Sequence, residues 1–458
     1  MPDTSKLVSV AAAVVLVAGG LYAAGIASAH YRLAPYRAAV GIADAFQAVS
    51  EDATTLTGLR PDRYLARRPG TGSGVVTDVV GDDRLVLLQG LFGDRLEARL
   101  IERDGTVLAV WSLSYAEHFA PDDLDPDAAD PALRPWKAPP QRDWNVSYQG
   151  IALTPEGDLL NVVSLNGLVK LDRCGARVWA RPGVFHHSIE PDGAGGWWVP
   201  GGRLYRAGEP SPWPVLDTPL KVDELWHLSP DGTIERRLSA LEALLEAGLE
   251  GMIAQNGVDD PSRLGNRGGG DQSDEVFHLN DVEPLPASMV AAFPMFAAGD
   301  LLVSYRNQNM IAVLDAESGR LLWWHVGSYL RQHDPDWVAD GTIVLYDNRR
   351  DGTDDGSALG GSRIVAIDPA DGSETVLVGG DGLFYSATRG KSQVLPDGDL
   401  LVTETNAGRA FQITRDGEIV WDYVNRYDEE RVGTLFEARS YPRSFFTVET
   451  WSCGTDAS

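Results

Sequence analysis

The chain has 458 residues, more than a single hydrophobic core usually serves, so it contains either several domains or one large repeated fold. Hydrophobic residues make up 43% and charged residues 23%, which is typical of globular proteins and excludes wholesale disorder. Lys and Arg number 39 against 66 Asp and Glu, for a net charge of -27, and so acidic a protein repels phosphate backbones, which argues against nucleic acid as a partner.

Residues 1–30 predict a signal anchor or a signal peptide. Leu7 to Ala29 is almost entirely apolar and is long enough to cross a bilayer as a helix. The run ends in Ala27-Ser28-Ala29, the small-x-small pattern of a signal-peptidase site, so cleaved signal and uncleaved anchor are both open. The length of the run favours the anchor. Either alternative predicts an exported chain on the periplasmic or extracellular side, anchored in the cytoplasmic membrane if the helix is retained.

Residues 31–74 are expected to form a helix followed by a linker, because apolar residues at helical spacing give way to a segment rich in Arg, Pro and Gly. From Val75 onward a different pattern recurs. A Pro- or Asp-Gly turn precedes a short β-rich run, and a second strand, tight turn and strand follow it. Two hairpins make one four-stranded sheet, so each unit predicts one blade of a β-propeller.

The repeat units give the number of blades. Complete units are expected at 143–182, 184–238, 278–326, 333–378 and 385–423. Val75 to Tyr115 is an incomplete unit, and a strand within Pro442 to Trp451 would complete it. These N- and C-terminal strands would close an all-β, six-bladed propeller over residues 75–451 and remove the open sheet edges, with 452–458 as a tail. A seventh blade would require strands hidden before Val75.

Two further features lie outside the repeat. Residues 239–276 form an insertion that begins with a helical pattern and ends in a Gly-rich loop, and a lid over the ring and a surface decoration are equally supported. The two cysteines, Cys174 and Cys453, are too few for a disulfide framework or a four-thiolate metal site. A single disulfide between them is left open.

Three of the eight histidines share one setting. His187, His278 and His333 each begin the first strand of a blade, just ahead of its turn. First strands line the central channel of a propeller, so these side chains are expected to face one another across it, with Arg306 on the strand after the His278 turn. Three imidazoles could instead be satisfied channel-lining residues or hold Zn²⁺, but a guanidinium beside a dication argues against the metal.

Four motifs follow one another along the chain at the spacing of the predicted blades. They are FHHS, then FHLNDV with VSYRNQNMIAVLD and LLWWHVG, then QHDPDWVADGTIVLYDNR, and finally FYSATRGKSQVLPDGDLLVTETNAGRAFQITRDGEIVWDY. Over about residues 143–425 they resemble the bacterial arylsulfate sulfotransferase family. The resemblance implies a six-bladed propeller. It also implies transfer of a sulfuryl group from a phenolic sulfate ester to a phenol acceptor, without a nucleotide sulfate donor, through a sulfohistidine.

The resemblance assigns roles residue by residue. It implies catalytic roles for His333 as the nucleophile and for His278, Arg306 and His187, and substrate-binding roles for His186 and Asn280. Within the His-His motif, His187 is favoured as the inward member. The chain departs from the family at Ser188, where Asp is usual, and at Asp281, where a small hydroxyl residue is common; it also lacks the family's short-loop cysteine pair.

These residue types suit the implied chemistry. A neutral imidazole is a competent nucleophile, and an Arg fork with further imidazoles can stabilise the sulfuryl oxygens and move the phenol proton. The expected partners are an aryl sulfate donor, a phenolic acceptor and the membrane, with no cofactor, metal or nucleic acid; a homodimer is compatible with the sequence. The departures at Ser188 and Asp281 suit a rival hypothesis, a catalytically inactive propeller that serves as a binding or assembly module of a membrane-associated complex.

Overall fold

The computed structural model describes residues 4–30, residues 64–119 apart from 69, 71 and 80, residue 143, residues 146–254 apart from 207 and 217, and residues 275–453. The chain divides into two compact units. One comprises Met1–Asp62 with Asn266–Asp271, and the other comprises Arg63–Gly265 with Gln272–Ser458. The predicted helix at 31–58 and most of the loop after residue 256 lie outside the described residues.

The described part of the first unit is helix α1 (Thr4–His30), so the predicted N-terminal helix is present. Its described side chains between Val15 and Ile26 are largely exposed and apolar. Among the residues that the structure describes, no helix is both long and apolar enough to cross a membrane. The anchor and the signal peptide therefore stay predictions.

The second unit consists of six antiparallel sheets, five with four strands and one with five, and a two-stranded pair, within the described residues. The first sheet has the order β27 (Leu435–Tyr441), β3 (Leu85–Phe92), β4 (Arg95–Glu102) and β5 (Val107–Ser112). The second contains β6 (Tyr148–Leu153), β7 (Leu159–Val163), β8 (Gly167–Leu171) and β9 (Arg177–Pro182). The third contains β10 (Glu190–Pro191), β11 (Trp197–Tyr205), β12 (Leu220–Leu228) and β13 (Ile234–Ser239).

The remaining sheets follow in chain order. The fourth contains β14 (Leu279–Pro284), β15 (Leu301–Tyr305), β16 (Met310–Leu314) and β17 (Leu321–Val326). The fifth contains β18 (His333–Trp337), β19 (Ile343–Asp347), β20 (Arg363–Ile367) and β21 (Glu374–Gly379). The sixth contains β22 (Lys391–Val394), β23 (Leu400–Glu404), β24 (Arg409–Ile413) and β25 (Ile419–Val424), with β2 (Gly74–Asp78) added at its outer edge. The predicted six-bladed, all-β propeller is confirmed in its sheets and their order.

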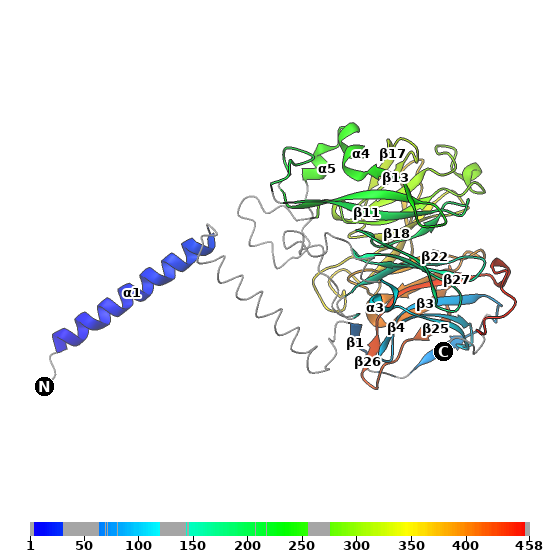
Figure 1. Ribbon diagram of the computed structural model, residues 1–458. Coiled ribbons are helices and arrows are strands. Elements are labelled where there is room, and N and C mark those ends of the chain that lie inside the picture. Colours follow the sequence, from blue (N-terminus) through cyan, green and yellow to red (C-terminus); the bar gives the residue numbers. More distant parts are fainter. Residues whose placement is uncertain are drawn as a thin grey trace. The chain divides into compact units, whose positions relative to one another are not determined.

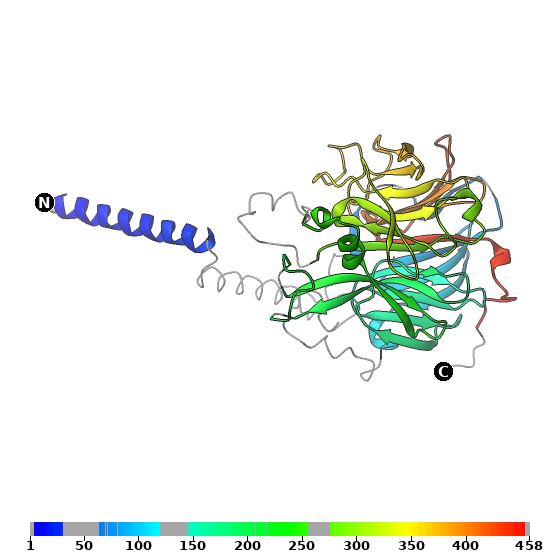
Figure 2. The ribbon, with the colours of Figure 1, turned by 90° about the horizontal axis from the view of Figure 1, so that it is seen from above.

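Strands from the two ends of the chain meet in the first and sixth sheets. β27 pairs with β3, and the two lie side by side in Figures 1 and 2. The prediction of a strand within 442–451 is wrong in position, because that segment contains the 3₁₀ helix η10 (Arg443–Phe445) and the pairing strand ends at Tyr441. The linker prediction for 59–74 is also incomplete, since β1 (Leu65–Arg67) pairs with β26 (Arg431–Gly433).

The apolar core lies between the sheets. Six clusters of buried side chains each fill the gap between two neighbouring sheets, and one of them joins Val86 and Leu88 of the first sheet to Leu401 and Trp421 of the sixth. Middle strands are buried on both faces, which is why sequences such as Met310–Leu314 are continuously apolar, whereas the outer strand β13 alternates. The first strands of the sheets follow one another around the centre of the ring.

Short helices decorate the sheets. The insertion after β13 forms two helices, α4 (Ala240–Glu246) and α5 (Glu250–Ala254), rather than one, and Ser239 caps α4 by accepting from the backbone N–H of Glu242. Apolar side chains of α4 are buried in the core between the third and fourth sheets, while residues 255–274 lie outside the described part, so the lid stays a prediction. Among the described residues, the other short helices are α3 (Tyr115–His118), η7 (Val290–Ala292), η8 (Arg306–Gln308) and η9 (Thr405–Ala407).

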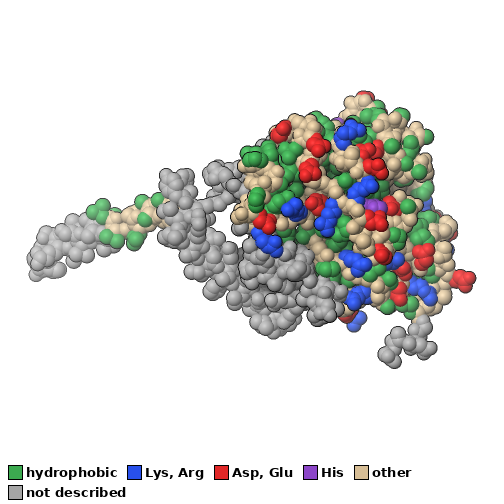
Figure 3. All heavy atoms as spheres, turned by 45° about the horizontal axis from the view of Figure 1, so that its top comes forward, with side chains coloured by type: hydrophobic (Ala, Val, Ile, Leu, Met, Phe, Trp, Pro, Cys, Tyr) green, Lys and Arg blue, Asp and Glu red, His purple; other side chains and the backbone are tan. Residues whose placement is uncertain are grey.

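Cys174 and Cys453 form a disulfide, with Cα atoms 5.7 Å apart, so the alternative that the sequence left open is settled in favour of pairing. The bond joins the turn between β8 and β9 to the segment after η10. On the face shown in Figure 3, Lys and Arg side chains are interspersed with Asp and Glu, so the excess of acidic residues does not make that face uniformly negative.

Candidate active site

Three imidazoles converge at the centre of the ring. The His187 ring lies 4.8 Å from the His278 ring and 6.2 Å from the His333 ring, between centroids. His187 precedes β10, His278 precedes β14, and His333 is the first residue of β18. The prediction that equivalent blade positions bring these side chains together is confirmed. With Arg306 they are called the imidazole cluster below.

The backbone is distorted where the imidazoles emerge. His187 and His278 have positive φ values of 64° and 52°, and Asp334, next to His333, has a φ of 53°. Such conformations are costly for residues with a Cβ and persist only where the surroundings hold them. The pairing register also shifts within β14 and β18, just after these positions. These distortions lie at the positions where the three rings come together.

His333 is buried, with 6% of its surface exposed. Burial, and next the nearby Arg306 guanidinium, hold the pKa of His333 well below its usual range. The ring is therefore neutral near pH 7 and carries the lone pair that a nucleophile requires. Arg306 is 7% exposed and is the first residue of η8, which keeps its guanidinium beside the cluster.

His186 supports His187 from behind. The two Nδ1 atoms lie 3.0 Å apart, and the Nε2 atom of His186 lies 3.1 Å from Oδ1 of Asp223 and 3.2 Å from the backbone oxygen of Gly201. Because both of these partners are acceptors, His186 carries its proton on Nε2, and its Nδ1 accepts from His187. The lone pair of His187 is then on Nε2. Burial, and next His278, hold the pKa of His187 well below its usual range.

This arrangement provides His187 with polar partners although position 188 is a serine, where the family usually has Asp. The backbone N–H of His187 donates to Oε1 of Gln149 at 2.7 Å, and Asp223 supplies a carboxylate to the histidine pair from β12. Ser188 is buried and accepts instead from the backbone N–H of Val282 at 3.2 Å. His187 is therefore oriented without a carboxylate at position 188, and it is the inward member of the pair, as predicted.

His278 is connected to the same support. Its Nδ1 donates to Oε2 of Glu275 at 2.5 Å, and Oε1 of Glu275 lies 2.5 Å from Nζ of Lys221. Lys221 in turn pairs with Asp223, so a continuous polar chain runs from His278 to His186. Burial opposes the ionised form of Glu275, but His278 and Lys221 outweigh it and hold the pKa of this carboxyl well below its usual range. The carboxylate of Glu275 holds the His278 ring by its Nδ1–H.

Asn280 and the aromatic residues complete a small cavity. Nδ2 of Asn280 donates to the backbone oxygen of Gln332 at 2.7 Å, while its buried Oδ1 accepts no hydrogen bond from the described residues. Together with the solvent space at its mouth, the cavity measures about 320 Å³. Its lining includes His187, Asn280, His333, Tyr148, Phe436 and Arg389. Arg389 lies over the Phe436 ring, 4.8 Å from its centroid, so this cavity offers aromatic faces together with a cation.

Other large aromatic residues of the blades do not line this cavity. Their side chains are buried in the apolar core between sheets: Trp197, Trp198, Tyr305 and Trp337. Tyr148 and Phe436 lack any sequence motif that marks them. Phe436 stands in β27, whose pairing with β3 is a contact between distant parts of the chain.

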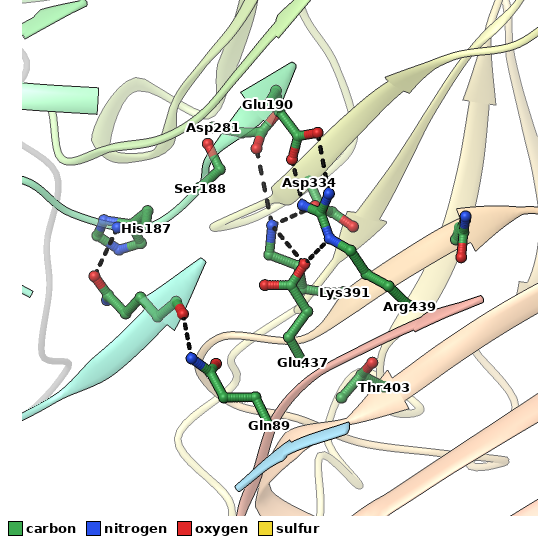
Figure 4. A network of polar contacts seen from close by, with 12 residues as sticks. Gln89, His187, Ser188, Glu190, Asp281, Asp334, Lys391, Thr403, Glu437 and Arg439 are labelled. Atoms are coloured by element: carbon green, nitrogen blue, oxygen red, sulfur yellow. Dashed lines mark hydrogen bonds and ion pairs between the residues drawn. The ribbon is translucent and has the colours of Figure 1, made fainter. Parts of the chain in front are cut away.

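A second group of buried polar residues adjoins the imidazole cluster, and Figure 4 shows most of it. We call it the carboxylate cluster; it consists of Glu190, Asp281, Glu283, Asp334, Asp336, Glu437, Lys391 and Arg439. Nζ of Lys391 lies 2.6 Å from Asp334 and 3.9 Å from Asp281, and Arg439 pairs with Glu190 and Glu437. The departure at Asp281 therefore belongs to this network and not to the cavity of the histidines.

Metal binding was the other rival for the histidines. Within the part of the chain that the structure describes, no three His, Cys, Asp or Glu side chains are grouped so that they could hold a metal ion.

The geometry defines a six-bladed propeller with three imidazoles, the Arg306 guanidinium and a small cavity near its centre. The family model described as Arylsulfotransferase (ASST) matches residues 166–426, more than half of the chain. The chain belongs to the arylsulfotransferase family, as the sequence motifs indicated. A comparison with curated proteins found no match.

Solved structures offer distant likenesses. A protein of unknown function from Bacteroides caccae is 11% identical, with a TM-score of 0.42, and the match covers 78% of this chain and 99% of that one. A streptogramin B lyase is 12% identical, with a TM-score of 0.38 and coverages of 79% and 88%. The WD40 propeller domain of Doa1 is 11% identical, with a TM-score of 0.39 and coverages of 84% and 100%.

Proposed function

We propose that the chain transfers a sulfuryl group from a phenolic sulfate ester to a phenol through a sulfohistidine at His333. The observation that carries the proposal is the neutral, buried His333 beside Arg306, with His187 lining the same cavity and His278 against the His187 ring. Membership of the arylsulfotransferase family supports the substrate class. No cofactor is needed, because the donor ester brings its own activated sulfuryl group.

In the first half-reaction, Nε2 of His333 attacks the sulfur of the donor. The nitrogen–sulfur bond forms, the ester sulfur–oxygen bond breaks, and the phenolate leaves with the bonding electrons. Arg306 stabilises the negative charge that grows on the sulfuryl oxygens. His278, protonated and held by Glu275, gives its Nε2 proton to the leaving phenolate.

In the second half-reaction, the acceptor phenol occupies the place of the departed phenol. Its proton passes to His278 or to the Nε2 lone pair of His187 while its oxygen attacks the sulfur. The nitrogen–sulfur bond breaks and its electrons return to His333. The unmatched Oδ1 of Asn280 is an acceptor for the phenol hydroxyl before the proton moves. Tyr148 and Phe436 give the aryl ring apolar faces.

The same proposal places the propeller outside the cytoplasm, attached through the N-terminal helix. Two features support this location. The disulfide between Cys174 and Cys453 requires an oxidising compartment, and α1 contains the apolar run that ends at Ala29. Protease protection of the tagged chain in intact cells and in spheroplasts tests it, since an exported propeller is digested only after the outer barrier is opened.

The rival hypothesis of an inactive binding platform rested on Ser188 and Asp281. Both residues have structural partners, Ser188 with Val282 and Asp281 in the carboxylate cluster, while the imidazole cluster is complete. No further observation favours the platform.

The test is a donor–acceptor assay on the purified full-length chain, with a chromogenic aryl sulfate and a phenol. We expect acceptor-dependent release of the chromogenic phenol, abolished in His333→Asn. His227→Asn is the matched control and should keep full activity. His227 pairs with Asp192, at a distance of 2.9 Å, and does not line the cavity. Full activity in His333→Asn would contradict the proposal, release without acceptor dependence would indicate hydrolysis, and no turnover with several donors would favour the platform.

A further inference from the structure

A buried asparagine that the motifs do not single out contacts the proposed nucleophile. Asn348 directly follows β19 and has no exposed surface. Its Oδ1 lies 2.6 Å from Nδ1 of His333. Its Nδ2 donates to the backbone oxygens of Ser386 at 2.7 Å and of Arg389 at 2.5 Å. All the hydrogen-bonding capacity of this amide is thus directed at the ring and at one loop.

The surroundings determine which way the amide faces. An Asn side chain has one oxygen that accepts and one nitrogen that donates, and the two backbone oxygens beside Nδ2 can only accept. Turning the amide over would place Oδ1 against both of them and lose two hydrogen bonds. The oxygen therefore faces His333.

Two acceptors then face one nitrogen of the ring. Besides Oδ1 of Asn348, the backbone oxygen of Arg331 lies 3.0 Å from Nδ1 of His333. Neither group can donate a proton, so Nδ1 carries the hydrogen and the neutral ring has its lone pair on Nε2. The opposite tautomer would leave a buried lone pair facing two oxygens.

We propose that Asn348 is a positioning residue that holds His333 in the tautomer whose Nε2 lone pair attacks the donor sulfur; this rests on the proposed sulfuryl transfer. As the nitrogen–sulfur bond forms, the ring becomes positively charged, and Oδ1 of Asn348 stabilises the Nδ1–H of that cation. When the bond breaks, Nδ1 keeps its hydrogen and the electron pair returns to Nε2.

A neutral partner suits this role better than a carboxylate. A carboxylate at Nδ1, like Glu275 at His278, favours the protonated ring, in which Nε2 has no lone pair. The charges that lower the pKa of His333 belong to the bases Arg306 and His278. The acids nearest to it in the chain and in the cavity wall, Asp334 and Glu437, are paired with Lys391 and Arg439. Asn348 therefore fixes the tautomer without promoting protonation.

The same amide ties the nucleophile to the wall of the cavity. The loop from Ser386 to Arg389 receives both Nδ2 bonds, and Arg389 lines the cavity over Phe436. Ser386 is itself held by Ser362, which accepts from its backbone N–H at 3.0 Å. The His333 ring and the cation over the aromatic face are thus held in one frame.

The tautomer can be measured without any substrate. The full-length protein is labelled with nitrogen-15 histidine, His333→Asn assigns the signal, and two-bond couplings show which ring nitrogen carries hydrogen. We expect the protonated Nδ1 and unprotonated Nε2 form in the unsubstituted protein. A predominant Nε2–H form there would overturn the inference. Because this readout needs no turnover, a protein with the expected tautomer and no transfer would contradict the proposed function alone.

Three variants test the role of Asn348 in the same preparations. Asn348→Ala should mix the tautomers and lower kcat about 10- to 100-fold with KM for the donor little changed, by analogy with the loss of hydrogen-bond partners of metal-bound histidines. Asn348→Asp keeps the acceptor, so it should retain the tautomer while moving the acid limb of the pH–rate profile to higher pH.

Asn406→Ala is the matched control. Asn406 accepts from Oγ of Ser386 at 2.9 Å, so its removal loosens the same loop without touching His333, and tautomer and kcat should stay close to those of the unsubstituted protein. An unchanged tautomer and kcat in folded Asn348→Ala, or equal losses in Asn348→Ala and Asn406→Ala, would overturn the positioning role.

Discussion

The imidazole cluster and the carboxylate cluster occupy neighbouring stretches of the same innermost strands, yet burial shifts the pKa values of their side chains in opposite directions. His333 belongs to one and Asp334 to the other, and Asn280 and Asp281 are divided likewise. Burial favours the neutral form of any titratable group, so it lowers the pKa of His333 and raises the pKa of Asp281 well above its usual range. The histidines become competent by losing charge, whereas the carboxylates need cations.

Lys391 and Arg439 are those cations. Burial alone would lower the pKa of Lys391, but Asp334 and then Glu437 outweigh it and raise the pKa instead. Lys391 and Glu437 also line the cavity of the histidines, so the two clusters share a wall (Figure 4). A buried, neutral His333 can therefore lie next to Asp334 because Lys391 pairs with that carboxylate.

Removing the cation from the wall that the two clusters share should have the largest effect on stability. Lys391→Met leaves Asp334 as a buried carboxylate without its cation, which typically costs about 3–5 kcal/mol of unfolding free energy. Urea unfolding followed by tryptophan fluorescence measures it. The control is Lys170→Met, because Lys170 pairs with Asp158 at a more exposed site, 3.0 Å apart, and such pairs contribute about 0–1 kcal/mol. Equal losses in the two variants would contradict the proposed division of roles.

The next effect sharpens the contrast within the imidazole cluster, where His278 has a carboxylate partner and His333 does not. Glu275→Gln should lower the rate of transfer about 10- to 100-fold, because it removes the charge that supports the protonated His278. The loss should grow with the pKa of the leaving phenol, which a series of substituted aryl sulfates measures. Glu374→Gln, which removes the acid beside His325 at 3.8 Å, is the control and should show no such dependence.

The fold was predictable where its signals are local. Asp-Gly turns and continuous apolar runs mark the hairpins, and Gly398, in one of these turns, has the positive φ of 90° that glycine adopts without strain. The strand that completes the first sheet was placed seven or more residues too late, because β27 is defined by its pairing with β3, about 350 residues earlier, and Leu435–Tyr441 has no turn phrase of its own. Contacts of that range leave no periodicity in either segment.

The residues of the candidate site likewise differ in whether a local sequence signal marks them. His187, His278 and His333 were predictable because the repeat puts them at equivalent positions. Glu275, Lys221 and Asn348 were not, since each acts through a contact that exists only once the strands bend at the positive-φ positions. Among 66 acidic residues, no sequence pattern distinguishes Glu275 or the members of the carboxylate cluster from ordinary surface charges.

The smallest expected effect is on the pH dependence of stability, and it comes from Asp336, a carboxyl of the carboxylate cluster that pairs with neither Lys391 nor Arg439. Burial, and next Asp334 and Glu283, raise the pKa of Asp336 well above its usual range, and its Oδ2 is buried without a hydrogen-bond partner among the described residues. The folded state therefore binds a proton that the unfolded state releases above about pH 4. As pH rises from there through the folded-state pKa, the unfolding free energy falls.

Asp336→Asn keeps the shape of this side chain and removes its titration. We expect the variant to be more stable than the unsubstituted protein by about 1 kcal/mol near pH 8, with little difference near pH 4, and thermal unfolding at both pH values measures it. Asp371→Asn is the control, since a backbone hydrogen bond from Ser373 lowers the pKa of that exposed carboxyl and gives the opposite sign of pH dependence. A variant that loses stability at the higher pH would show that Asp336 is ionised in the fold and that the carboxylate cluster carries more charge than Lys391 and Arg439 balance.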